Sequence, residues 1–188
     1  MSDIVSFLVM FMITIGCLSL IVVQLFTGVP SLSSSASEAA DAIALLKEAN
    51  LPPQPIIYEL GSGWGALVIA LAHAFPDAQV RGIEISPLPY WIARWRTRKM
   101  SNVSLIWANF NKCDLADADA VTCYLMRNPM VKLAVLFDGM LKPGTSVVSV
   151  MFWFRDRQVA ATRRGDMRGA VALYKWPAIK ADSLNASA

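Results

Sequence analysis

The sequence predicts an α/β protein whose mostly parallel sheet is covered by helices on both faces and preceded by one transmembrane helix. Three observations lead to this fold class. After residue 55, short apolar runs typical of strands alternate with amphipathic runs typical of helices, as they do in parallel sheets. A glycine-rich turn follows the first of these strands. At the N-terminus, no charged side chain occurs from Ile4 to Phe26.

The uncharged N-terminal run predicts a transmembrane anchor over residues 1–26. A helix rises about 1.5 Å per residue, so this run is long enough to cross a hydrocarbon layer about 30 Å thick. A cleaved signal peptide is the alternative, because Ser35-Ala36-Ser37 has the small residues of a cleavage site. The anchor is favoured because Asp3 but no basic residue precedes the run, which also exceeds the usual signal-peptide core.

Residues 27–55 are predicted to form a linker and one short helix. Thr27 to Ser37 is rich in Gly, Pro and Ser, as flexible linkers are. Apolar residues then recur at helical spacing from 38 to 50, with Ser37 as a candidate cap. Prolines at positions 52, 53 and 55 end this helix.

Residues 56–188 are predicted to form one globular domain. The expected strands are 56–60, 79–84, 103–107, 119–125, 145–154 and 169–176, and the expected helices are 65–75, 87–100 and 129–141. Ser86-Pro87 and Asn128-Pro129 each place a capping side chain before a proline at the first helical position. Because only 34 residues follow Phe154, we expect the sheet to end with one or two antiparallel strands.

The cysteine and histidine content excludes several kinds of site. Cys17, Cys113 and Cys123 form no C-x-x-C pair and no even framework, which favours a reduced compartment. His73 is the single histidine, so neither a metal site nor a histidine-based catalytic triad is expected. All 17 Lys and Arg lie from Lys47 onward, too far from the apolar run to indicate its orientation.

The turn after the first strand reads Tyr58-Glu59-Leu60-Gly61-Ser62-Gly63-Trp64-Gly65. Glycines without Cβ atoms let the backbone turn sharply and approach a ligand, and the following helix directs free N–H groups at it. This context predicts a Rossmann-like pocket for a nucleotide-type cofactor. Because Gly61, Gly63 and Ala66 also satisfy the dinucleotide pattern G-x-G-x-x-A, the glycines alone leave NAD and S-adenosylmethionine both open.

Two acidic residues bear on the choice of cofactor. Glu59 lies two positions before the first glycine, where a carboxylate would attract the amino group of an aminocarboxylate and repel a pyrophosphate. It therefore favours S-adenosylmethionine. Glu84 ends the second strand, where an acid accepts hydrogen bonds from ribose hydroxyls in proteins that bind either cofactor.

With E-L-G-S-G-W-G as a first motif and G-I-E-I as a second, residues 56–176 resemble the class I S-adenosylmethionine-dependent methyltransferases. Within that superfamily the chain resembles the membrane-anchored protein-lysine methyltransferases that modify the ATP synthase c subunit and the adenine nucleotide translocase. The apolar span, the Val-Pro linker, the short helix and the run I-E-I-S-P-L-P-Y-W-I-A-R-W-R carry this resemblance. It implies S-adenosylmethionine as cofactor, bound by Glu59, Gly61, Ser62, Gly63, Gly65, Glu84 and Asn109.

The sequence departs from the family pattern at two positions of the implied site. Trp64 stands in the glycine loop where the family usually has Asp, and it would narrow the mouth of the site. Asn109 stands where an Asp usually follows the third strand, and its amide retains the capacity to hydrogen-bond an adenine edge. Tyr124, near the end of the fourth strand, is a candidate to face the substrate, and no catalytic base is identified.

The resemblance implies a membrane-anchored enzyme that N-methylates a lysine of a membrane protein. Its catalytic domain is expected on the cytoplasmic or matrix side, where S-adenosylmethionine is supplied. A lipid or quinone acceptor is one alternative, because the anchor permits it equally. A non-catalytic cofactor-binding or scaffold domain is another, motivated by Trp64, Asn109 and the short C-terminal part.

A cluster of basic residues follows the second strand. Arg94, Arg96, Arg98 and Lys99, with Trp91 and Trp95 expected on the other face of their helix, suit anionic lipid headgroups or an acidic partner. An ordinary solvated face is the alternative. Nucleic acid is not an expected partner in view of the membrane span, although further basic residues occur at Arg155, Arg157, Arg163, Arg164 and Arg168.

Overall fold

The computed structural model describes residues 2–27, 36–124, 127–155, 157–163 and 170–179. Seven strands form one sheet in the order β3-β2-β1-β4-β5-β7-β6. They are β1 (Ile56–Leu60), β2 (Gln79–Glu84), β3 (Val103–Trp107), β4 (Ala120–Cys123), β5 (Ser146–Val150), β6 (Ala161–Arg163) and β7 (Val171–Lys175). Strands β1 to β5 pair in parallel, whereas β7 is antiparallel to β5 and to β6. The predicted Rossmann-like α/β fold and its antiparallel ending are confirmed.

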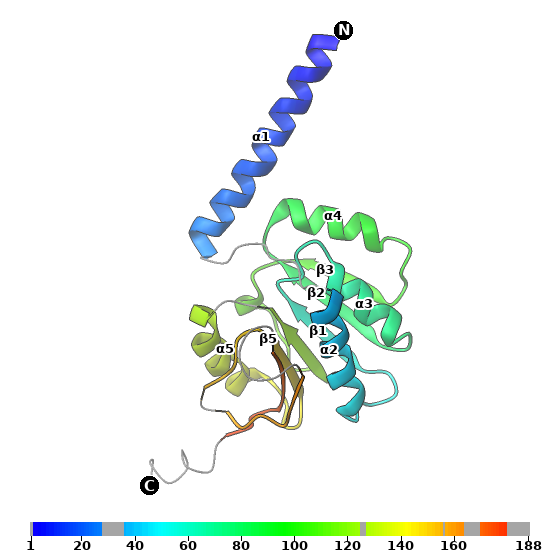
Figure 1. Cartoon of the computed structure of the whole chain (residues 1–188), viewed down its shortest axis with the longest axis vertical. Coiled ribbons are helices and arrows are strands. Elements are labelled where there is room, and N and C mark those ends of the chain that lie inside the picture. The colour runs from blue at the N-terminus through cyan, green and yellow to red at the C-terminus, as the bar shows by residue number, and fades with distance from the viewer. Residues whose placement is uncertain (1, 28–35, 125–126, 156, 164–169, 180–188) are drawn as a thin grey trace.

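Helices cover both faces of the sheet (Figure 1). Helices α2 (Ala36–Glu48) and α3 (Ala66–Ala74) share one buried apolar cluster with the sheet, and α5 (Arg127–Met140) shares the other. Side chains alternate along a strand, so Ile57 of β1 joins the first cluster while Tyr58 and Leu60 join the second. Every residue of β4 and of β5 is buried, which explains why these two central strands contain no charged residue.

Most element boundaries lie within two residues of the predictions, but β5 ends at Val150 rather than at 154 and α4 ends at Thr97 rather than at 100. Helix α4 (Pro87–Thr97) begins at the predicted proline with Ser86 at the N-cap position, but the Ser86 side chain makes no capping hydrogen bond. That cap prediction was wrong. Helix α5 begins at Arg127, so Asn128 lies inside its first turn, and the side chains there are outside the description. Strand β6 and the 3₁₀ helix η1 (Phe110–Lys112) were missed because three residues show no readable periodicity.

The N-terminal residues form a separate helix, α1 (Ser2–Thr27), which projects from the domain beside α4 (Figure 1). The large apolar side chains described there, which lie between Ile4 and Leu18, are exposed, as Phe7 and Met12 illustrate. Near the domain, an ideal Cβ built on Gly16 would lie 3.3 Å from Cδ2 of Leu88 in α4. Over the residues that the structure describes, no helix meets the length and apolarity required of a membrane span, so the predicted transmembrane anchor is not supported there. Residues 28–35 of the predicted linker lie outside the described ranges.

Candidate functional site

The loop between β1 and α3 has a backbone that only glycine adopts readily. Gly61, Gly63 and Gly65 have φ angles of 76°, 51° and 80°, in the left-handed region. The loop turns back onto β2, because the N–H groups of Gly61 and Ser62 both donate to the Ile83 carbonyl, at 2.9 and 3.0 Å. The alternating glycines are therefore a backbone requirement of this turn.

The two later glycines of the loop differ in what surrounds them. An ideal Cβ on Gly65 would lie 3.0 Å from Cβ of Ala93, so α4 packs closely against the end of the loop. Among the described residues, an ideal Cβ on Gly63 would meet nothing nearer than the Gly61 carbonyl oxygen, at 4.0 Å. The loop is thus closed against α4 at one end and open at its middle, where a ligand has room to approach.

Gly82, in the middle of β2, is a site-forming residue that sequence reasoning missed. An ideal Cβ there would lie 2.6 Å from Cδ2 of Leu105, 2.9 Å from Cβ of Ser62 and 2.9 Å from Cγ2 of Val68. Those atoms belong to β3, the glycine loop and α3. The motif G-I-E-I contained this glycine, but a strand glycine alone does not reveal which elements approach it.

Glu84 holds the glycine loop against the end of β2. Its carboxylate is buried, and Oε2 accepts a hydrogen bond from the Gly63 N–H at 2.8 Å while Oε1 accepts one from the Ser86 N–H at 2.7 Å. The sequence predicted only a ribose-binding role for Glu84, and this second role emerges from the fold. Each carboxylate oxygen has a further lone pair, so the two contacts leave acceptor capacity for ligand hydroxyls.

Glu59 lies at the end of β1 with only 4% of its surface exposed. The pKa of its carboxyl is well above the usual value, mainly because burial disfavours the charged form. A hydrogen bond with the Val68 backbone partly offsets this rise, and the charge of the nearby Glu84 carboxylate adds to it. Within the described residues, neither Oε2 of Glu59 nor the buried Oγ of Ser62 has a hydrogen-bond partner. A buried polar atom without a partner is costly, so both atoms fit a ligand that brings hydrogen-bonding groups.

Asn109 lies just beyond β3, beside the end of β2. In the sheet Glu84 is the register partner of Trp107, two residues before Asn109. The Asn109 side-chain oxygen accepts a hydrogen bond from the Asn111 N–H at 3.0 Å and so caps η1. The predicted residues of β1, β2 and β3 therefore meet at the carboxyl ends of three neighbouring strands, where open α/β sheets bind ligands.

Trp64, the unusual residue of the loop, is fixed through its backbone. Its carbonyl accepts a hydrogen bond of 2.5 Å from the Arg96 guanidinium of α4. Together with the contact between Gly65 and Ala93, this hydrogen bond ties the loop to α4. Helix α4, which carries the basic residues Arg94 and Arg96, therefore packs against the predicted cofactor loop.

Tyr124 and Met151 follow β4 and β5, on the other side of β1. The Tyr124 hydroxyl donates a hydrogen bond to Sδ of Met151 at 2.9 Å, and Met151 has a left-handed φ of 71°. Burial raises the pKa of Tyr124, and the charge of Glu38 in α2 raises it further. His73 lies in α3, and no cluster of metal-ligating side chains occurs in the described ranges.

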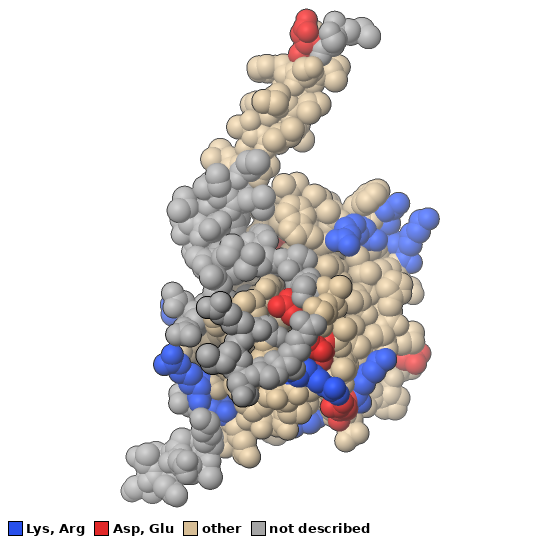
Figure 2. All heavy atoms as spheres, in the orientation of Figure 1, with Lys and Arg blue, Asp and Glu red and all other residues tan. Residues whose placement is uncertain are grey.

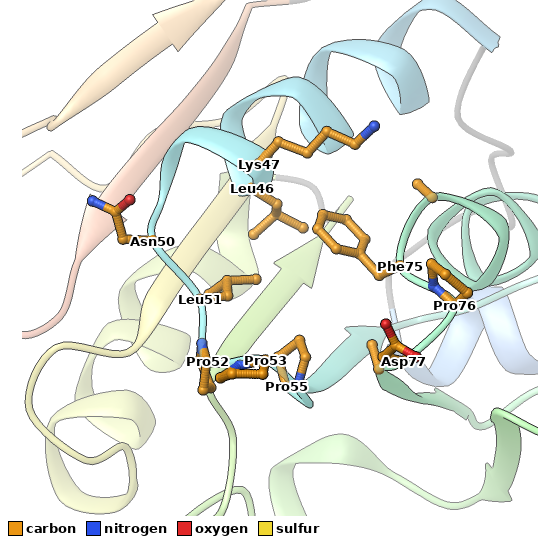
Figure 3. A pocket seen from close by; sticks show the side chains of 12 residues that line it. Leu46, Lys47, Asn50, Leu51, Pro52, Pro53, Pro55, Phe75, Pro76 and Asp77 are labelled. Carbon is orange, nitrogen blue, oxygen red and sulfur yellow. The ribbon is translucent and has the colours of Figure 1, made fainter.

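A cavity of about 430 Å³ opens at the opposite end of the sheet (Figure 3). It lies between the end of α2 and the turns that precede β1 and β2, with Leu46, Pro53 and Phe75 among its lining residues. None of the predicted cofactor residues lines it. The cavity is therefore separate from the site at the carboxyl ends of the strands.

Comparison with known proteins finds relatives among the methyltransferases. The model of the ANTKMT methyltransferase domain matches residues 59–161. A protein-lysine N-methyltransferase of Saccharolobus islandicus (strain REY15A) is 31% identical over 136 residues, which are 69% of this chain and 84% of the relative.

Solved structures resemble the fold. An RNA methyltransferase from Salinibacter ruber, in complex with S-adenosyl-L-homocysteine, has a TM-score of 0.69 and 26% identity, covering 78% of this chain and 94% of that one. A precorrin-6y C5,15-methyltransferase from Geobacter metallireducens GS-15 has a TM-score of 0.55 at 16% identity, covering 77% of this chain and 89% of that one, and supports the fold alone. The family match and the Saccharolobus relative show that this chain is an S-adenosylmethionine-dependent methyltransferase and belongs to the family defined by the ANTKMT methyltransferase domain.

Proposed function

We propose that this enzyme N-methylates a lysine side chain of a protein. The observation that carries the cofactor site is a buried Glu59 oxygen without a hydrogen-bond partner among the described residues, beside a glycine loop that is open at Gly63. The lysine acceptor is supported by the similarity to the Saccharolobus protein-lysine N-methyltransferase. A carboxylate, an open glycine loop and a second carboxylate on the next strand suit the amino acid and ribose parts of S-adenosylmethionine.

Each predicted site residue has a proposed part in holding the cofactor. Glu59 accepts a hydrogen bond from the ligand ammonium group, and Ser62 and the backbone at Gly61, Gly63 and Gly65 surround the amino acid part. Glu84 accepts hydrogen bonds from the ribose hydroxyls, and Asn109 contacts the adenine edge. The bound cofactor supplies an electrophilic methyl group on a sulfonium. The remaining catalytic task of this chain is to align the acceptor and exclude water.

The acceptor nitrogen attacks only in its neutral form. A free lysine has a pKa of about 10.4, so the enzyme must favour loss of that proton before transfer. Apolar surroundings disfavour the ammonium form and lower its pKa. We propose that the acceptor enters past Tyr124 and Met151, the side chains that follow β4 and β5 at the same edge of the sheet as the glycine loop. This scheme requires no dedicated base.

Cofactor binding is expected to release a proton from Glu59. Because the pKa of Glu59 is raised in the free protein, its carboxyl is protonated up to a higher pH than an ordinary glutamate, and an incoming ammonium group favours the ionised form. Affinity for S-adenosylmethionine should therefore rise with pH until that raised pKa is passed. Calorimetry in two buffers of different ionisation enthalpy measures the released proton.

Glu59→Gln is the matched variant for this measurement, since it keeps the shape of the side chain and removes the titrating group. This variant should bind S-adenosylmethionine more weakly and release no proton through this position.

The raised pKa of Glu59 also predicts how the stability of the parent depends on pH. The free energy of unfolding should fall as pH rises from the pKa of Glu59 in the unfolded chain, near 4.5, towards its raised pKa in the folded protein, because the native state then holds more protons than the unfolded chain. Equal proton release by parent and variant would contradict the assignment of Glu59.

We further propose that α1 contacts a lipid bilayer, that the acceptor lysine belongs to a membrane protein, and that the domain lies on the cytoplasmic or matrix side. The support is the exposed apolar surface of α1, together with the absence of charged residues from Ile4 to Phe26. A lipid or quinone acceptor is the second candidate, supported by the same surface. A domain that binds the cofactor without methyl transfer is the third.

One labelling experiment separates these candidates. Membranes are incubated with methyl-labelled S-adenosylmethionine and either the parent enzyme or Gly63→Arg, whose side chain would fill the open part of the loop. Parent-dependent label should enter a protein band and yield methyl-lysine on hydrolysis. Label confined to the lipid extract would favour the second candidate. Intact cofactor binding with no label anywhere would favour the third.

A further inference from the structure

Helix α4 presents aromatic and basic side chains together on one exposed face. We give the name α4 surface to Trp91, Arg94 and Trp95 of α4 together with Arg98 and Lys99, which directly follow its last residue; all five are exposed, Trp91 by 56% and Trp95 by 65%. The Arg94 guanidinium lies 5.7 Å from the centre of the Trp91 ring, and that of Arg98 lies 4.4 Å from the Trp95 ring. The expectation that the tryptophans lie on the opposite face was therefore wrong.

The charge of the α4 surface is locally uncompensated. From Ile85 to Cys113 the sequence contains five Lys and Arg residues and no Asp or Glu. In the described part of the chain, the ion pairs involve basic residues of other segments, namely Arg81, Lys142, Arg157 and Arg163. Basic side chains gather over α4 at the upper right of Figure 2. Such a patch attracts an anionic partner.

The apolar surroundings of this patch indicate the class of partner. Trp107 of the edge strand β3 is also exposed, and its ring stacks on that of Tyr90 in α4, with the ring centres 6.0 Å apart. The exposed apolar helix α1 reaches α4 where Gly16 approaches Leu88. An apolar helix, exposed tryptophans and arginines thus adjoin one another. Tryptophan rings favour the headgroup level of a bilayer, where Lys and Arg attract anionic lipids.

We propose that the α4 surface binds the headgroup region of an anionic lipid bilayer. A nucleic acid or an acidic protein would satisfy the charges, but a bilayer also accommodates the neighbouring helix α1, which has no charged residue after Asp3. Binding there would fix how the cofactor loop is oriented relative to the bilayer, because Arg96 of the same helix donates a hydrogen bond to the Trp64 carbonyl of that loop. The inference extends the membrane contact proposed above, and it is tested without methyl transfer.

Tryptophan fluorescence tests the contact directly. All six tryptophans lie in the domain and none lies in α1. Bromine on lipid acyl chains near the headgroup quenches the fluorescence of nearby tryptophans, so brominated vesicles report contact of the domain and not of α1. We expect quenching of the parent and loss of most of it in Trp91→Phe/Trp95→Phe, even where α1 still holds that variant on the vesicle. Equal quenching of parent and variant would overturn the proposal.

A charge experiment tests the lipid preference. Arg94→Gln/Arg98→Gln/Lys99→Gln should lower the preference for anionic over neutral vesicles by about 100-fold, and about 1 M salt should remove it from the parent. The control Lys47→Gln/Lys132→Gln/Arg155→Gln removes the same charge from exposed residues elsewhere. Thermal unfolding verifies that both variants fold.

The outcomes of the charge experiment are distinct. Loss of the preference in the α4 variant alone supports the proposal. Equal loss in both variants, or in neither, overturns it. If the α4 variant instead loses affinity for an RNA oligonucleotide or an acidic peptide while its vesicle binding is unchanged, the partner is not a bilayer. None of these results depends on S-adenosylmethionine, so failure here leaves the methyltransferase assignment intact.

Discussion

The Glu84→Ala enzyme is expected to bind S-adenosylmethionine about 100-fold more weakly than the parent. The carboxylate accepts hydrogen bonds from the N–H groups of Gly63 and Ser86, at 2.8 and 2.7 Å. A hydrogen bond to a charged group contributes about 1.5–3 kcal/mol, and about 1.4 kcal/mol corresponds to a tenfold change in affinity. Alanine would leave both N–H groups without their acceptor, release the middle of the glycine loop and remove the proposed ribose contact. Calorimetric titration measures the affinity.

Glu84→Gln is the matched control for this prediction. The amide keeps the size of the side chain and one acceptor oxygen, but its NH₂ group faces one of the two backbone donors. We therefore expect an affinity between those of the parent and Glu84→Ala. Circular dichroism and urea unfolding establish that each variant is folded before titration. An alanine variant that bound the cofactor within about threefold of the parent would show that Glu84 is dispensable.

Gly82→Ala is expected to lower the free energy of unfolding by about 1–3 kcal/mol, the usual effect of overpacking a core. The cause is steric, because Gly82 is not among the glycines with positive φ. Its new methyl group would lie 2.6 Å from Cδ2 of Leu105 and 2.9 Å from atoms of Ser62 and Val68. Any shift of Ser62 displaces the glycine loop, so affinity for S-adenosylmethionine should fall together with stability. Urea unfolding and cofactor titration measure the two effects.

Gly139→Ala provides the control for the same substitution at an open position. An ideal Cβ on Gly139, in the last turn of α5, meets no described atom within 4 Å, so alanine there should stabilise the helix by up to about 1 kcal/mol. Leu105→Ala removes the nearest clashing atom, and the double variant with Gly82→Ala should be more stable than the sum of the single effects implies. Unchanged stability in Gly82→Ala would contradict the steric account.

The elements that sequence patterns predicted well are those specified by their own residues. The boundaries expected for β1, β2 and β3 agree with the structure, because each strand is a short run with several apolar residues that lies between turn or helix signals. The glycine loop was equally readable, since a left-handed backbone at Gly61, Gly63 and Gly65 is a local property of the chain. Strand β6 was not readable, because three residues become a strand only by pairing with β7.

The face of a helix that interacts with a partner was harder to infer. Sequence reasoning placed Trp91 and Trp95 opposite the arginines, whereas Arg94 lies over Trp91 and Arg98 over Trp95. Residues three and four apart on a helix are neighbours, so the spacing contained this information. The exposure of these side chains depends instead on what packs against α4, and only the tertiary structure provides that.

The sequence by itself determined the fold class, the glycine loop and the choice of S-adenosylmethionine, because periodicity, backbone φ and the charge of Glu59 are carried by neighbouring residues. The tertiary structure alone decided what holds the site together. Glu84 fixes the glycine loop through a hydrogen bond from the Gly63 N–H, and the missing side chain of Gly82 allows β3, the glycine loop and α3 to pack closely against β2. Both depend on contacts between segments that meet only when the parallel sheet has formed, and a close approach of that kind leaves no local pattern in the chain.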